Sequence, residues 1–138
     1  NSTQGAARFA RDVLSLKPDI VFLDYALNDR GIGLDKANEA WTSMILAGQK
    51  TGALIVLLTP TPDLAARMGE ADEPLTQHSE QIKTLAKVHG LALADPYREF
   101  CRLQDAGHKL ENFMSQGNHP NRAGHEIVAQ LLMEQIDP

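Results

Sequence analysis

Residues 17–29 read KPDIVFLDYALND, an apolar run held between a proline and a group of polar residues. The run Ile20–Leu23 is short and rich in β-branched and aromatic residues, which predicts a parallel strand buried on both faces. Polar residues follow where this strand should end, and Asn28 is among them. Because ligands of parallel sheets bind beyond the carboxyl ends of the strands, Asn28 is a candidate site residue.

Helices and strands alternate along the rest of the chain. Apolar residues recur at helical spacing, and glycines or prolines follow most of these segments. The sequence predicts helices over residues 6–16, 34–50, 76–89, 97–103 and 121–135, and strands over residues 20–23, 53–58 and 91–94. This alternation indicates a three-layer α/β/α sandwich of the flavodoxin-like type with a parallel sheet. Because three strands make a small sheet, we expect one or two strands before Asn1, so that residues 1–138 are a single, amino-terminally incomplete domain.

Composition and charge narrow the possible functions. A length of 138 residues suits one domain with its own core. The net charge of -5 argues against binding to nucleic acid or anionic membranes, and no apolar run approaches the roughly 18 residues of a membrane span. The single cysteine, Cys101, excludes an internal disulfide, and no histidine stands in a metal-binding pattern. We therefore expect neither a metal nor an organic cofactor.

A second polar stretch, SQGNHPNRAGH at residues 115–125, places a histidine before a helix. Pro120 restricts the backbone directly after His119, and Asn121 can cap the helix that follows. That helix carries apolar residues at helical spacing, so one of its faces should dock into a core. His119 should then lie at the rim of the molecule, exposed but held still, as a proton carrier requires. An ordinary loop histidine before a surface helix is the alternative interpretation.

Taken together, the stretches 17–29 and 115–125 resemble the conserved blocks of the SGNH, or GDSL-type, hydrolase family. The first resembles the block in which a strand ends in Gly-x-Asn-Asp, and the second resembles the histidine block. The resemblance implies that His119 is the general base that activates a serine. It also implies that the Asn28 side-chain amide donates to the oxyanion of the tetrahedral intermediate. A small-molecule ester, either a carboxylic ester or an acetylated sugar, would be the substrate.

The chain departs from the family pattern at three places. It has no Gly-Asp-Ser block, and Ser2 lies too close in sequence to the Asn28 strand to replace it, so the nucleophilic serine is expected upstream of Asn1. Gln116 stands where the family has an aspartate, three residues before His119. Gln116 could orient the imidazole of a Ser-His dyad, or Asp63 or Asp95 could replace the missing acid. Ala26 stands in place of the usual glycine.

Two further interpretations remain open from the sequence. The phrase PDIVFLDY at residues 18–25 is also similar to the phosphoacceptor strand of receiver domains, with Asp24 as acceptor and Thr59 as the switch hydroxyl. That interpretation lacks the expected Lys-Pro after the third strand and leaves His119 unexplained. The other alternative is a non-catalytic SGNH-like binding module. Under the hydrolase hypothesis, residues 1–138 should be inactive alone and should contact a missing amino-terminal segment or a second chain.

Overall fold

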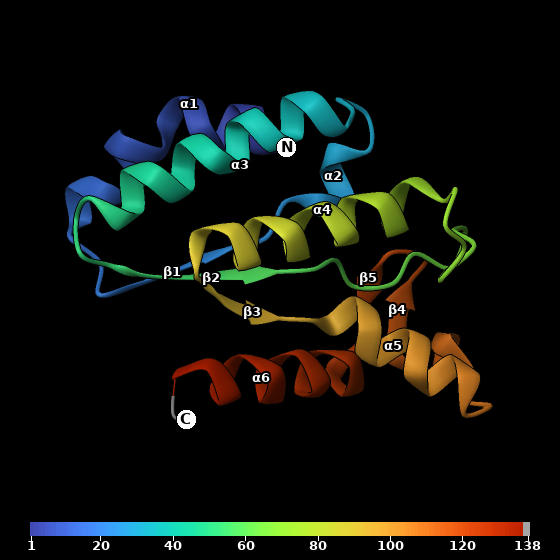
Figure 1. Ribbon diagram of the computed structural model, residues 1–138. Coiled ribbons are helices and arrows are strands. Elements are labelled where there is room, and N and C mark those ends of the chain that lie inside the picture. Colours follow the sequence, from blue (N-terminus) through green and yellow to red (C-terminus); the bar gives the residue numbers. More distant parts are fainter. Residues whose placement is uncertain (137–138) are drawn as a thin grey trace.

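A parallel sheet of three strands, in the order β1-β2-β3, forms the middle of the computed structural model, which describes residues 1–136 (Figure 1). The strands are β1 (Ile20–Leu23), β2 (Leu54–Leu58) and β3 (Ala92–Ala94). Ile20 pairs with Leu54 and Val56 pairs with Ala92, so all carboxyl ends lie at one edge. With helices on both faces, this arrangement confirms the predicted α/β/α fold.

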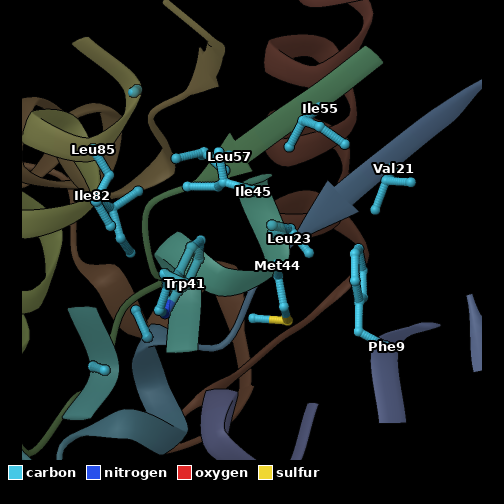
Figure 2. Packing of buried hydrophobic residues seen from close by; sticks show 13 residues of the cluster. Phe9, Val21, Leu23, Trp41, Met44, Ile45, Ile55, Leu57, Ile82 and Leu85 are labelled. Atoms are coloured by element: carbon cyan, nitrogen blue, oxygen red, sulfur yellow. The ribbon is translucent and has the colours of Figure 1, made fainter. Parts of the chain in front are cut away.

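Three helices cover one face of the sheet and enclose the main hydrophobic core. They are α1 (Ser2–Asp12), α3 (Leu34–Gln49) and α4 (Pro74–His89). Helix α3 contributes Trp41, Met44 and Ile45, which are almost fully buried because their helical spacing places them on one stripe. Figure 2 shows these side chains beside apolar residues of α1, α4 and the strands. Trp41 is therefore a core residue.

The opposite face is covered less completely. Helix α6 (Arg122–Ile136) lies against β3, and α5 (Pro96–Asp105) packs against α6. The predicted apolar face of α6 is half-buried rather than deeply buried, and Gly124 is its one fully buried residue within residues 122–136.

Strand β1 lies at the sheet edge farthest from the α6-covered β3, and its outer face is open. Ile20 is 36% exposed and Phe22 44% exposed, and Leu54 beside them on β2 is 41% exposed. The prediction that the first strand is buried on both faces is therefore wrong. The helices α1 and α3 bury one face only, and the described residues place no helix over the other face of β1.

Shorter elements complete the described chain. They are η1 (Leu14–Leu16), α2 (Ala26–Asp29), η2 (Leu110–Phe113), β4 (Met114–Gln116) and β5 (His119–Pro120). The sequence did not predict α2 or the β4–β5 hairpin, and both contain candidate site residues. The first helix begins earlier than predicted because Asn1 caps it, accepting the N–H of Gln4 at 3.2 Å. Within residues 1–136, none of the helices has the length and apolarity needed to cross a bilayer.

Candidate active site

Asn28 lies in the four-residue helix α2, directly beyond the carboxyl end of β1. Its backbone N–H donates to the carbonyl of Tyr25 at 2.9 Å, which closes the tight turn out of the strand. The Asn28 residue is exposed, and within residues 1–136 its side-chain amide makes no hydrogen bond. The amide is thus available to a ligand at the edge of the sheet where the fold places ligands.

Asp29, the residue after Asn28, is fully buried and joins three helices. Its Oδ1 accepts the backbone N–H of Ser2 at 2.7 Å, and its Oδ2 accepts the indole N–H of Trp41 at 2.8 Å. These bonds tie α2 to the first turn of α1 and to the middle of α3. The sequence alone indicated no role for Asp29. The Asn-Asp pair at a strand end was visible there, but only the fold brings Ser2 and Trp41 to its carboxylate.

His119 is in β5, the second strand of a short hairpin that leads into α6. The Ser115 hydroxyl donates to the carbonyl oxygens of His119 at 3.0 Å and Pro120 at 3.3 Å, which stiffens the hairpin. Asn121 caps α6 as predicted, since its Oδ1 accepts the N–H of Gly124 at 3.1 Å. His119 itself is exposed, so its imidazole is accessible to solvent while the hairpin restrains its backbone.

Gln116 lies directly opposite His119 in the hairpin, as its antiparallel partner. Opposed residues of such a pair have Cβ atoms about 4.5–5.5 Å apart, so the two side chains are neighbours. Within residues 1–136 no hydrogen bond joins them, and Gln116 is exposed. The geometry is compatible with Gln116 as an orienter of the imidazole.

The two alternative acids are engaged elsewhere. Asp63 accepts Arg30 Nη2 at 2.7 Å and the N–H of Ala65 at 2.9 Å. Asp95 accepts the Thr59 hydroxyl at 2.7 Å and caps α5. In the part of the chain that the structure describes, neither carboxylate contacts His119.

A chain of contacts connects the segment of Asn28 to the segment of His119. Arg30, at the end of α2, binds Asp63 in the loop after β2. The next residue, Leu64, donates its backbone N–H to the carbonyl of Gly117 at 2.7 Å, at the tip of the hairpin. Figure 1 shows α2 and the hairpin at the same end of the sheet, beyond the carboxyl ends of its strands. The loop after β2 therefore holds both segments at one edge.

The acids at this edge have shifted proton affinities. Desolvation of the carboxyl group and repulsion from Asp29 raise the pKa of Asp24 to about 6, although the residue keeps exposed surface. Desolvation alone would raise the pKa of Asp63, but the N–H of Ala65 and the Arg30 guanidinium bring the pKa below its ordinary value. Asp63 is thus held as an anion. No group of three or more His, Cys, Asp or Glu residues within residues 1–136 is arranged to hold a metal ion.

Comparison with known proteins supplies an independent test. A sequence profile of the GDSL-like lipase/acylhydrolase family matches residues 1–127. A comparison with curated proteins found no match. Among solved structures, an acetylxylan esterase from Geobacillus stearothermophilus superposes with a TM-score of 0.85 at 22% identity, over 99% of this chain and 68% of that protein. The acetyl xylan esterase AlAXEase superposes with a TM-score of 0.79 at 22% identity, over 97% of this chain and 75% of the AlAXEase chain.

Proposed function

Since the chain belongs to the GDSL-like lipase/acylhydrolase family and is a hydrolase of the esterase type, we propose that Asn28 and His119 are its catalytic residues. The observation that carries this proposal is the link through Asp63 and Leu64, which holds α2 and the histidine hairpin at one edge of the sheet. Both candidate side chains are exposed there and have no partner among residues 1–136. Both side chains can therefore form hydrogen bonds with a substrate.

In the proposed reaction, a serine hydroxyl attacks the carbonyl carbon of an ester while His119 takes the hydroxyl proton. The electron pair of the carbonyl moves to oxygen, and the Asn28 side-chain N–H donates to the resulting oxyanion. The intermediate collapses, and the alcohol leaves with the proton from His119. Water then repeats the sequence on the acyl-serine and releases the acid. Gln116 would keep the imidazole oriented without supplying the negative charge of a triad carboxylate.

The serine would come from a segment outside residues 1–138. Ile20, Phe22 and Leu54 form an apolar face that is more than one-third exposed at each residue, and β1 pairs with β2 alone among the described strands. An unpaired edge of this kind favours the addition of a strand. A strand that pairs with β1 in parallel would have its carboxyl end beside Asn28, which is where the nucleophile is needed.

The substrate is proposed to be a short carboxylic ester or an acetyl ester of a carbohydrate. The acetylxylan esterases that share the fold support this class. The connecting segments over residues 60–72 and 106–109 flank the proposed site in sequence, and loops generally vary more between relatives than the elements they connect. They are the segments in which acyl and sugar preference would be encoded.

The test uses the protein expressed from its complete reading frame, with p-nitrophenyl acetate as substrate. His119→Ala and Asn28→Ala should each lower kcat, with Asn28→Ala costing about 10²–10³-fold because one oxyanion donor is lost. His125→Ala is the matched control, because His125 is an exposed histidine six residues further along, on α6. Unchanged turnover in His119→Ala would remove His119 from the mechanism. A complete protein with no turnover of any ester would favour a non-catalytic binding module.

A further inference from the structure

The buried carboxylate of Asp29 lies next to Asn28, the proposed oxyanion donor, and contacts two other helices. It is 0% exposed and follows Asn28 directly in α2. Its two oxygens accept one backbone donor from the start of α1 and one side-chain donor from the middle of α3. A buried carboxylate is costly unless such donors compensate it, so both hydrogen bonds should be kept in the folded protein.

The helix that carries Asn28 has few bonds of its own. Helix α2 has four residues and no side-chain cap at its start, so its orientation depends on contacts with other elements. The Asp29 carboxylate supplies two of these contacts at 2.7 and 2.8 Å. Helix α2 can rotate only slightly without breaking one of these two hydrogen bonds. Because Asn28 belongs to the same short helix, its side chain is restrained as well.

The amino end of α1 is held against the same point. The ring of Tyr25 lies so close to α1 that a Cβ on Gly5 would be 2.5 Å from it. Tyr25 also packs edge-on against Trp41, with ring centroids 6.2 Å apart. Asp29 is therefore surrounded by the first turn of α1, the end of β1 and helix α3. Its carboxylate accepts hydrogen bonds from α1 and α3.

We propose that Asp29 is a positioning residue of the oxyanion hole, which fixes the Asn28 amide relative to the amino end of α1 before the substrate binds. The inference rests on the proposed role of Asn28 as an oxyanion donor. That role requires the amide to point at the position of the oxyanion, and the two hydrogen bonds of Asp29 restrain the short helix that carries Asn28. A donor displaced by about 1 Å can cost on the order of 10²-fold in rate, so a clamp between the two elements acts directly on kcat.

A double-mutant cycle in the complete protein tests this role. Asp29→Asn keeps the shape of the side chain but turns one acceptor into a donor, which opposes either Ser2 N–H or the Trp41 indole. We expect Asp29→Asn to lower kcat for p-nitrophenyl acetate by about 10²-fold with a smaller change in KM, since the misplaced donor acts mainly in the transition state. Adding Asn28→Ala to this variant should then cost less than about 10-fold, against about 10²–10³-fold in the wild type.

Glu73→Gln is the matched control. Glu73 is a buried acid that accepts a backbone N–H, that of Arg67 at 3.1 Å, but it lies at the start of α4 and forms no hydrogen bond with Asn28, Asp29 or His119 among residues 1–136. In this background Asn28→Ala should retain its full cost. If Asp29→Asn does not yield folded protein by circular dichroism, the same cycle is run with Trp41→Phe, which removes one donor to Asp29 and keeps an aromatic ring.

Trp41 provides a readout that does not depend on activity. It is the one tryptophan in these 138 residues, and its indole N–H resonance is identified by its loss in Trp41→Phe. The resonance should move in Asp29→Asn and stay in place in Glu73→Gln, because only the first change removes its charged acceptor. An unmoved resonance in Asp29→Asn would overturn the inference.

The outcomes separate the two proposals. If Asn28→Ala lowers kcat by the same factor with and without the Asp29 substitution, Asp29 does not position Asn28, while the role of Asn28 stands. The same criterion applies to Trp41→Phe where that variant replaces Asp29→Asn. If Asn28→Ala has no effect on kcat in the wild type, the proposed function fails, and the inference fails with it.

Discussion

Replacing Gly124 with alanine should loosen the packing that holds the His119 hairpin on α6. Gly124 is buried in the first turn of this helix, against Phe113, which directly precedes the hairpin, and Pro120 of β5. A Cβ added there would lie 2.9 Å from the Cβ of Pro120 and closer still to the carbonyl oxygen of Phe113. Neither atom belongs to a flexible side chain, so the helix and the hairpin must move apart.

Two effects of opposite sign set the magnitude. Overpacking of this kind costs about 1–3 kcal/mol. Alanine in a helix interior is better than glycine by about 1 kcal/mol, and less in a first turn. The steric term should win, and the free energy of unfolding should fall by about 1–2 kcal/mol. With a urea m-value of about 1–3 kcal/mol/M, the midpoint should fall by roughly 0.3–2 M.

Urea unfolding followed by circular dichroism measures this change, and Ala129→Gly provides the reference. Ala129 is an exposed residue of the same helix, so its replacement reports helix propensity without the steric contact, and it should cost about 1 kcal/mol. If propensity governed Gly124 as well, Gly124→Ala would stabilise the protein. A midpoint at or above that of the wild type would refute the proposed contact.

Three further outcomes are expected. Asp63→Asn should lower the free energy of unfolding by about 1–2 kcal/mol, because its pair with Arg30 is partly shielded from water. Because the pKa of Asp63 in the folded protein lies below its ordinary value, the difference in free energy of unfolding between wild type and variant should be present above about pH 4 and vanish as pH falls through the folded pKa. Urea midpoints that still differ at pH 2 would contradict this ion pair. Asp24→Asn should stabilise the protein at pH 7 and change little near pH 3, because a carboxyl whose pKa rises to about 6 on folding loses stability as pH rises from about 4 through 6; an NMR titration that returns an ordinary pKa for Asp24 would refute this reasoning. Phe22→Ser should cost at least about 1 kcal/mol more in a longer form of the protein than in residues 1–138, where Phe22 is 44% exposed, and equal costs would argue against a segment that covers this face of β1.

Local sequence patterns were sufficient for the layers of this fold. The apolar runs over residues 20–23 and 54–58 and the helical stripe of Trp41, Met44 and Ile45 each depend on neighbours within a few positions. Asn121 as a helix cap is a local feature of the same kind. The burial of β1 on both faces was predicted wrongly, because the cover over a strand comes from other segments and not from the strand itself.

The sequence by itself therefore determined the α/β alternation, the family resemblance, and the positions of Asn28 just beyond the first strand and of His119 just before the last helix. Only the tertiary structure decided that Gln116 faces His119 across a hairpin, that Arg30 and Asp63 bridge the two candidate segments, and that Asp29 joins three helices. Hydrogen bonds between residues 27 or 33 positions apart leave no periodic signal in a sequence, because periodicity records only which face of its own element a side chain occupies.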